Sequence, residues 1–440
     1  MKAGTDAVPS STSLLINLSQ KLSHDKFIGM SGDVRSPVNN PFEPGSDRIP
    51  TVWAGRVPQL ADWRDRLRPR RARGQYERGR MYLGEPGIGK SVLARRIARD
   101  AGQRGDLATR QIRIPRGGDP IALLSEALVE LAGRAGLPTG RERRLGELLA
   151  RVRALSLAGA SVSLAPGDGP PPHRDLTALL VEVARQAFAE QRVVVVHLDE
   201  VQNVTSVDLL SATLVALGDA LAHEEPHHVP GGAVLSVHLP IVVLLTGLPE
   251  FYDDASSLSG ATFTRRFAAE VLEPISDSDL RDALHPFVFD GCEVDTPAGA
   301  RARVLLDPDA AEAIVERACG DPFVFQLAGQ AAWDAGDGAR ITRREVERGW
   351  RFASREARDH VERQLSRLPG KERALLDAMA GLEESERNAT RIAHRMGHDS
   401  ATQIGPTAQR LDRVRGLIDR GRRYAFRSRT VGAYLEGRWP

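Results

Sequence analysis

This sequence has little cysteine, little excess charge of either sign and no long apolar run. Cys292 and Cys319 are its only cysteines, which excludes a disulfide framework and suits a reducing compartment such as the cytoplasm. Lys and Arg number 60 against 58 Asp and Glu, a formal net charge of +2, so any basic patch must be local. The apolar runs 193–196 and 241–245 have strand length and are too short to span a membrane. We therefore expect a cytoplasmic globular protein of two or three domains.

Lysine is also scarce, and its position is informative. Of the 60 basic residues only five are lysines, and Lys90 is the only lysine between residues 27 and 370. Together with flanking glycines and a serine it fits the pattern G-x-x-x-x-G-K-[ST] of a phosphate-binding loop. A compact ammonium group on a thin stem fits inside such a loop, whereas a planar guanidinium does not. The predicted nucleotide-binding residues of the loop are Gly84, Glu85, Pro86, Gly87, Ile88, Gly89, Lys90, Ser91 and Val92.

The residues on either side supply the context that this loop requires. Residues 81–83 are typical of a strand end, and the apolar residues after the loop recur at helical spacing. The glycines let the backbone turn its N–H groups toward phosphate oxygens, and the helix adds the positive end of its dipole. We expect Lys90 to reach the β- and γ-phosphates of a nucleotide and the Ser91 hydroxyl to bind Mg²⁺.

A second motif follows a run of four valines at 193–196. Such apolar strands belong to the buried centre of a parallel sheet, whose carboxyl ends border the ligand crevice. We predict that Asp199 holds the Mg²⁺ shell and that Glu200 orients and deprotonates the attacking water. The alternative is a carboxylate pair that only solvates a strand end. Thr246, at the tip of the next apolar strand, either positions the same water or is an ordinary strand-end threonine.

The alternation of strands and helices divides the chain into four predicted parts. From the loop to residue 272 the pattern predicts an α/β P-loop NTPase of the ASCE type with a doubly wound parallel sheet, and after Ser276 it is helical. The parts are a flexible arm or extended wrap at 1–50, an α/β nucleotide-binding domain at 51–274, a helical lid at 275–367 and a C-terminal domain at 368–440. We also predict a β-hairpin at 153–166 and two separate lid helices at 342–351 and 353–367.

Residues 223–227 match H-E-x-x-H, the zinc-binding helix motif of metalloproteases. That chemistry requires both histidines on one face of a continuous helix. Pro226 removes a backbone N–H and breaks such a helix, and Pro230 with two glycines follows at once. We therefore predict no zinc site in this segment.

The C-terminal part has the elements of a winged helix-turn-helix. Predicted helices at 372–380, at 388–396 and from Pro406 precede a short hairpin at 421–427. Nine arginines between residues 410 and 438 outnumber three acidic residues, an excess that suits phosphate contact. The third helix would read a DNA groove and the hairpin would contact phosphates, through Gln409, Arg410, Arg413, Arg422, Arg423 and Arg427. A winged helix used only for protein contacts is the alternative.

With both motifs and the strand tip at 246–249, the chain resembles AAA+ ATPases. The order of strand, helix, Asp-Glu motif, helical lid and C-terminal winged helix is similar to the origin-recognition-complex-like initiator group and its bacterial relatives. The resemblance implies that Val52 and Arg56 flank an adenine. It also implies that Arg265 or Arg266 is an arginine finger that reaches the γ-phosphate of a neighbouring subunit. Arginines that neutralise a helix end are the alternative.

The predicted lid departs from this pattern. AAA+ lids commonly carry an arginine that senses the γ-phosphate, but the matching stretch at 320–325 contains none. Gly320 and Pro322 look more like the Gly-x-Pro lid motif of STAND signalling NTPases, which places Pro322 among the nucleotide-binding residues. A nucleotide-gated switch therefore stands beside a lid-coupled motor.

Taken together, these patterns predict an ATP-binding AAA+ ATPase. It would hydrolyse ATP with Mg²⁺ and couple its nucleotide state to the binding of double-stranded DNA and to assembly, as a homo-oligomer or with a partner protein. One alternative is a STAND-like switch whose winged helix makes protein contacts, and another is an interaction platform with a structural nucleotide. DNA-stimulated turnover favours the ATPase, whereas tightly bound ADP with negligible turnover favours the switch.

Overall fold

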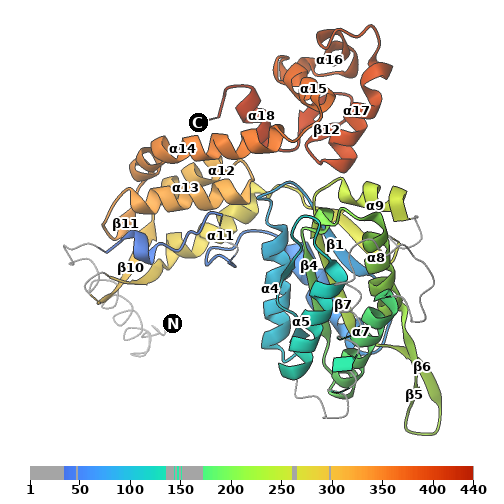
Figure 1. Ribbon diagram of the computed structural model, residues 1–440. Helices are drawn as coiled ribbons and strands as arrows, with labels where there is room; N and C mark the ends of the chain where they lie inside the picture. The colour runs from blue at the N-terminus through green and yellow to red at the C-terminus, as the bar shows by residue number, and fades with distance from the viewer. Residues whose placement is uncertain are drawn as a thin grey trace, which may run out of the picture.

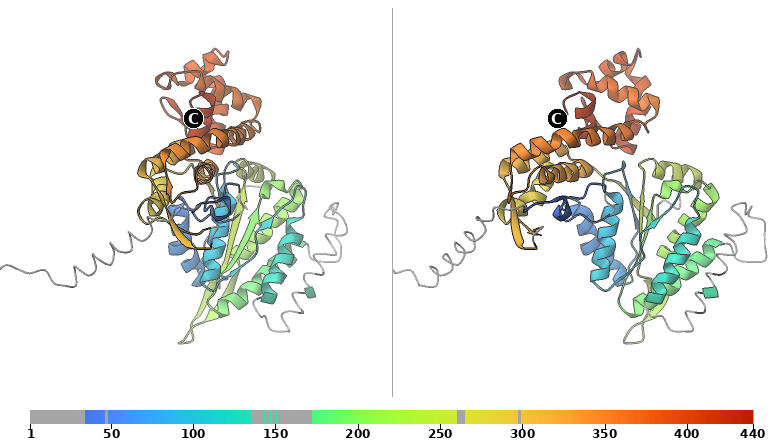
Figure 2. Two further views of the ribbon diagram at one scale, coloured as in Figure 1. Left: turned by 90° about the vertical axis from the view of Figure 1, so that its left-hand side faces the viewer. Right: turned by 60° about the vertical axis from the view of Figure 1, so that its left-hand side comes forward.

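The computed structural model describes residues 34–45, 48–134, 172–259, 265–296 and 299–439, together with single residues between 143 and 150. These residues form an α/β body and a helical body side by side, and the C-terminal end of the helical body lies above the α/β body (Figure 1). The same arrangement is seen in the rotated views (Figure 2). The hairpin predicted at 153–166 and the first 33 residues of the predicted arm lie outside the described residues.

A parallel sheet forms the centre of the α/β body. Its strands are β1 (Gly79–Leu83), β2 (Leu107–Ala108), β3 (Ile112–Arg113), β4 (Val194–Asp199), β7 (Ile241–Gly247) and β8 (Phe267–Val271). They lie in the order β2-β4-β7-β1-β8, with β3 also beside β4, and each of these pairings is parallel. One strand, β7, therefore separates β1, which precedes the phosphate-binding loop, from β4, which ends in Asp199. The predicted doubly wound parallel sheet of a P-loop NTPase is confirmed.

Helices cover both faces of this sheet. One face carries α4 (Lys90–Gln103) and a continuous helical stretch of α2 (Val57–Ala61), η2 (Asp62–Leu67) and α3 (Arg68–Ala72). The other face carries α5 (Pro120–Arg134), α7 (Pro172–Ala189), α8 (Val207–Ala222) and α9 (Phe251–Ser259). The two layers follow from the alternation of side chains along β4. Val194 and Val196 pack in one apolar cluster, and Val193 and Val195 pack in the other.

An unpredicted hairpin projects from the far end of the α/β body (Figure 1). It consists of β5 (Glu224–His228) and β6 (Val234–His238), which pair in antiparallel register. His223 ends α8, so the H-E-x-x-H segment begins at a helix end and continues as a strand. The two histidines of that motif therefore do not lie on one helical face.

The helical body begins with the predicted lid. Its elements are α11 (Asp277–Phe289), β9 (Cys292–Asp295), β10 (Arg301–Leu306), α12 (Pro308–Ala318), α13 (Pro322–Asp334), β11 (Arg340–Ile341) and α14 (Arg343–Leu365). The small sheet β11-β10-β9 was not predicted. The prediction of two helices at 342–351 and 353–367 is wrong, because α14 runs unbroken through the expected gap. Its buried residues keep one helical stripe from Val346 to Val361, so nothing interrupts the helix.

The C-terminal unit has three helical segments and a hairpin in the predicted order. Its elements are α15 (Gly370–Ala380), α16 (Ala389–Arg395), η5 (Ala401–Ile404), α17 (Gly405–Gln409), η6 (Arg410–Val414), β12 (Ile418–Arg420), β13 (Tyr424–Phe426) and α18 (Arg429–Leu435). The last helix, α18, was not predicted and packs against α14 and α15. The assignment of this unit as a winged helix stays a prediction.

A single apolar cluster runs through the lid and the C-terminal unit. It includes Trp350 of α14 and Trp439 near the C-terminus, whose ring centroids are 6.0 Å apart. The segment 34–45 joins the same body, because Val34 and Phe42 are buried in this cluster. The α/β body has two separate clusters, one on each face of its sheet. The predicted boundary at 367–368 therefore crosses a continuous core.

Candidate functional site

A cavity of about 290 Å³ lies where the phosphate-binding loop meets the lid. That volume is close to the lower end for small-molecule sites, ~300–1,000 Å³. An N-terminal stretch at 43–56, the loop at 86–92 and the start of α13 at 322–326 line it, together with Glu200 and Arg113. The predicted site residues among the lining are Val52, Arg56, Pro86, Gly87, Ile88, Gly89, Lys90, Ser91, Val92, Glu200 and Pro322.

Glycines allow the loop to curve tightly and to approach the lid. Gly87 and Gly89 both have φ of 90°, a value that residues with side chains rarely adopt. A Cβ on Gly87 would lie 2.5 Å from Cε1 of His360 in α14. The glycine is therefore required for the contact with the lid as well as for the turn.

Lys90 lies buried inside the loop. Its Nζ donates to the carbonyl oxygens of Gly84 at 2.8 Å and Glu85 at 3.1 Å. Burial lowers the pKa of this ammonium group, and the carboxylates of Glu200 and Glu85 act in the opposite direction. A buried cation at the wall of a cavity is suited to a charge-assisted hydrogen bond with an anion.

Ser91 and Asp199 meet at the end of β4. The Ser91 Oγ donates to Oδ1 of Asp199 at 2.8 Å, and the Thr246 hydroxyl donates to the same oxygen. Burial disfavours charge on Asp199, but hydrogen bonds from Thr246 and Ser91 help to hold its pKa below the usual range. Burial lowers the pKa of His197, which lies 3.3 Å behind Thr246, to about 4. A hydroxyl beside an ionised carboxylate is a donor set that fits Mg²⁺ in a phosphate site.

Glu200 follows β4 directly and faces the cavity. Its φ is 60°, a left-handed value that turns the chain sharply after Asp199. The Gln202 amide donates to the Glu200 carboxylate, and its Oε1 accepts from the Leu248 backbone N–H at 3.1 Å. Gln202 therefore connects Glu200 with the loop after β7. We did not predict this residue, because its role depends on a contact between two strands.

The N-terminal stretch forms a wall of the cavity and contacts both the loop and the lid. Arg56 donates to the carbonyl oxygen of Ile88 at 2.7 Å, and burial lowers the pKa of its guanidinium to about 10. The Gln326 amide of α13 donates to the carbonyl oxygen of Val52 at 2.8 Å. These two side chains tie the wall to the loop and to the lid, and Pro322 lies at the same cavity.

Two buried polar residues of α14 also contact the loop and were missed. Nε2 of His360 lies 3.2 Å from Oδ2 of Asp321, and the Gln364 amide donates to the carbonyl oxygen of Pro86 at 3.2 Å. His360 and Gln364 are spaced four residues apart on an otherwise apolar stripe. That spacing is the one signal in the sequence that could have marked them.

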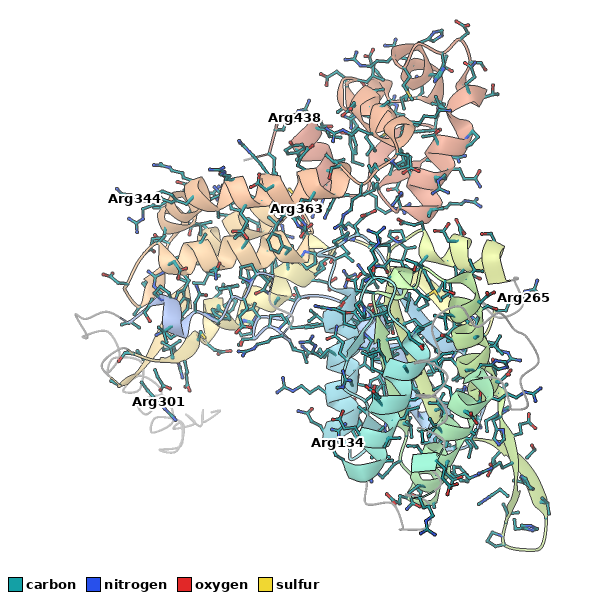
Figure 3. All side chains as sticks on the ribbon, in the orientation of Figure 1. Arg134, Arg265, Arg301, Arg344, Arg363 and Arg438 are labelled. Carbon is teal, nitrogen blue, oxygen red and sulfur yellow. The ribbon has the colours of Figure 1, made fainter. Side chains whose placement is uncertain are left out.

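The two candidate finger arginines lie away from the cavity. Arg265 is exposed at the outer edge of the α/β body (Figure 3). Nη1 of Arg266 pairs with Oδ1 of Asp219 in α8 at 2.5 Å. Neither residue lines the cavity of its own chain, so an arginine finger that acts between subunits stays a prediction.

The candidate groove-reading residues face the α/β body. Gln409, Arg410 and Arg413 line a groove of about 750 Å³ opposite β8 and Tyr252 of α9. Nε of Arg410 also pairs with Oε1 of Glu372 in α15 at 3.0 Å. These side chains are exposed to solvent and lie along this groove.

The candidate phosphate-contacting residues of the hairpin differ from one another. Arg422 and Arg423 are exposed in the turn between β12 and β13 and pair with no residue that the structure describes. Arg427 instead pairs with Asp412 at 2.9 Å and Asp419 at 2.5 Å. Arg422 and Arg423 are therefore available for a phosphate, whereas Arg427 supports the hairpin itself.

Among the described residues, no group of three or more His, Cys, Asp or Glu side chains is placed to hold a metal ion. No helix there combines the length and apolar character needed to cross a bilayer.

Comparison with known proteins gives similar structures, whereas no family model and no curated protein matches the sequence. The chain is similar to the ORC2 protein of Aeropyrum pernix in ADPNP–ADP complexes, with 14% identity, 92% of this chain and 99% of that chain covered, and a TM-score of 0.49. The chain is also similar to the ORC1 protein of Aeropyrum pernix in complex with DNA, with 16% identity, 88% of this chain and 94% of that chain covered, and a TM-score of 0.37. For the RuvB Holliday junction branch migration motor of Thermotoga maritima the identity is 15%, the coverage is 85% of this chain and 92% of that chain, and the TM-score is 0.37. At such identities and TM-scores, these similarities carry no argument about function.

Proposed function

We propose that this chain is an ATP-binding AAA+ ATPase that hydrolyses ATP with Mg²⁺ and couples its nucleotide state to DNA binding and assembly. The observation that carries the proposal is the convergence of the loop lysine, the Ser91–Asp199 pair at 2.8 Å and Glu200 on one cavity. The carboxyl ends of parallel strands, where Asp199 and Glu200 lie, are the usual ligand-binding edge of such sheets.

The binding step uses three kinds of group. The backbone N–H groups of Gly87 and Gly89 and the Lys90 ammonium would bind phosphate oxygens. Ser91 and Asp199 would hold Mg²⁺, which when bound neutralises charge on the β- and γ-phosphates. Val52 and Pro322 lie at the part of the cavity between the N-terminal stretch and the lid, where a base would bind.

The hydrolysis step uses Glu200 as the general base. Its carboxylate accepts a proton from a water molecule as the water oxygen attacks the γ-phosphorus. The bond from that phosphorus to the bridging oxygen breaks, and the products are ADP and phosphate. The hydrogen bond from Gln202 holds the Glu200 side chain at the cavity.

The test is a titration of purified protein with a fluorescent ATP analogue and Mg²⁺. Lys90→Ala removes hydrogen bonds to a charged ligand, ~1.5–3 kcal/mol, so we expect affinity to fall roughly 10- to 100-fold. Arg99→Ala changes an exposed cation on the same helix and is the matched control. A correctly folded Lys90→Ala protein with unchanged affinity for the ATP analogue would contradict the assignment of residues 84–91 as a phosphate-binding loop.

DNA binding and assembly belong to the same proposal. Arg422 and Arg423 support phosphate contact at the hairpin because they are exposed and free of partners among the described residues. Arg265 supports contact with a second subunit because it is exposed at an edge of the α/β body. For an arginine finger, the rate of ATP turnover per chain should rise with protein concentration. In the Arg265→Ala protein this rate should be lower at every concentration.

A STAND-like nucleotide-gated switch is the second candidate. The observation in its favour is that the lid meets the loop through His360 and Gln364, while the stretch 320–325 has no arginine. Such a lid could hold one nucleotide tightly. Mass spectrometry of the purified protein distinguishes the two candidates, since retained ADP with negligible turnover supports the switch.

A further inference from the structure

The two bodies are joined by polar contacts around the phosphate-binding loop. The apolar cluster of the helical body is separate from the two clusters of the α/β body. At the joint, Gln364 of α14 donates to the loop at Pro86. Arg415, from the C-terminal unit, reaches Oε1 of Glu85 in the loop at 3.7 Å and Oε2 of Glu250 after β7 at 2.9 Å.

Arg415 is the central residue of this joint. Its side chain is 6% exposed and faces three carboxylates from three segments, since its Nε also pairs with Oε2 of Glu372 in α15 at 3.1 Å. A buried cation of this kind is stable only while its partners stay in place, because an uncompensated buried charge is costly. Separation of the two bodies would remove Glu85 and Glu250 and leave Glu372.

The same joint places the candidate DNA-reading residues opposite the α/β body. With Arg415 in place, Gln409, Arg410 and Arg413 line the groove against β8 and α9. A recognition helix enters a DNA major groove about 12 Å wide and 8.5 Å deep. A duplex that approached Gln409, Arg410 and Arg413 would meet β8 and α9 on the other side of this groove.

We propose that Arg415 is a latch that docks the C-terminal unit on the phosphate-binding loop, holds its candidate DNA-reading residues against β8 and α9, and is released by nucleotide binding. This inference rests on the proposed function and names its regulation. Because Arg415 contacts Glu85 of the phosphate-binding loop, a change in this loop on nucleotide binding acts on the latch without another nucleotide-sensing residue.

The direction of the coupling follows from Lys90. In the docked arrangement the Lys90 ammonium donates to the carbonyl oxygen of Glu85, the residue whose side chain faces Arg415. A phosphate competes for that ammonium, so nucleotide binding loosens the loop conformation that holds Arg415. By thermodynamic reciprocity, release of Arg415 raises nucleotide affinity.

The test compares two carboxylate substitutions in the full chain. Glu250→Gln weakens the latch, and Glu250 does not line the nucleotide cavity. Asp277→Asn is the matched control, because Asp277 of α11 pairs with Arg429 of α18 at 2.5 Å inside the helical body. The readouts are the dissociation constant for a fluorescent ATP analogue, the dissociation constant for a labelled duplex without nucleotide, and the radius of gyration from X-ray scattering.

We expect Glu250→Gln to tighten binding of both the analogue and the duplex by about fivefold or more, the lower end of typical coupling, and to extend the particle. Asp277→Asn should change neither. Charge reversal in Glu250→Arg should enlarge each effect. A Glu250→Gln protein with a larger radius of gyration but unchanged nucleotide affinity would overturn the coupling between the latch and nucleotide binding. If all three readouts are unchanged in this protein, the latch itself is contradicted.

Failure of the inference can be told apart from failure of the proposed function. Wild-type protein that binds ATP and duplex DNA, but does not respond to Glu250→Gln or Glu250→Arg, contradicts the latch alone. Wild-type protein that binds neither ligand contradicts the proposed function, and scattering, which needs no ligand, still reports whether Glu250 docks the C-terminal unit.

Discussion

The α/β body and the helical body bury their apolar residues differently. The α/β body has one cluster on each face of its sheet, whereas the lid, the C-terminal unit and residues 34–45 share one cluster. Between the bodies, Arg415 and Gln364 make polar contacts at the loop and at Glu250. The helical body therefore has its own core, and a movement of this body relative to the α/β body would change contacts of the loop.

The largest expected effect tests the chemistry of the α/β body, where Glu200 lies. Glu200→Gln keeps the shape of the side chain and removes the base, so turnover should fall by about 10²–10⁴-fold while ATP stays bound. Glu270→Gln, at an exposed carboxylate of β8, is the control. The measurement is phosphate release under saturating ATP, and turnover at the wild-type rate in the Glu200→Gln protein would assign the base elsewhere.

The second prediction tests whether the helical body is one cooperative piece. Leu376 of α15 is fully buried in its cluster, so Leu376→Ala should destabilise the body by about 2–5 kcal/mol. Hydrogen exchange should then speed up in α14 of the lid as well as in α15. Leu217→Ala, at an equally buried site of α8, should leave α14 protected. Faster exchange confined to the C-terminal unit would contradict a shared core.

The third prediction concerns pH at the joint. Burial raises the pKa of Glu85 from 4.5 to about 7, although the charge of Arg415 acts against this. Between these values the folded protein keeps a proton that the unfolded chain has lost, so this contribution to stability falls as pH rises and is lost above pH 7. The loss is at most about 3 kcal/mol.

Glu85→Gln should remove that dependence and stabilise the protein at pH 8 but not at pH 4.5. Urea denaturation at both pH values measures the effect, with Glu356→Gln at an exposed site of α14 as the control. An equal change at both pH values would show that Glu85 is ionised throughout.

The smallest effect concerns the exposed end of the helical body. Replacing both Arg422 and Arg423 by Ser should make the salt dependence of duplex binding shallower by about 2 units of slope, one for each phosphate contact. A double change of the exposed lid arginines Arg344 and Arg351 should leave the slope as it is. Equal slopes in all three proteins would favour a C-terminal unit that contacts protein.

The sequence predicted the elements that local patterns define. Residue spacing within short segments defines the loop at 84–92, the strand that ends at Asp199 and the helices that cover the sheet. These elements could therefore be predicted from the sequence. Arg415 and Glu85 lie 330 positions apart (415 minus 85), and Gln364 meets Pro86 across 278 positions, so no local pattern could link them. The merger of two predicted helices into α14 has a different cause, because Trp350 and Ala353 belong to one helical stripe of buried residues, a local spacing that the prediction overlooked.

The central claim is that nucleotide state controls DNA binding, and one measurement tests it directly. The Glu200→Gln protein, which should hold ATP uncut, is titrated with a labelled duplex in saturating ATP and without nucleotide at one low salt concentration. The account predicts tighter binding with ATP by about fivefold or more. Equal affinity with and without ATP, or no binding in either condition, would contradict it.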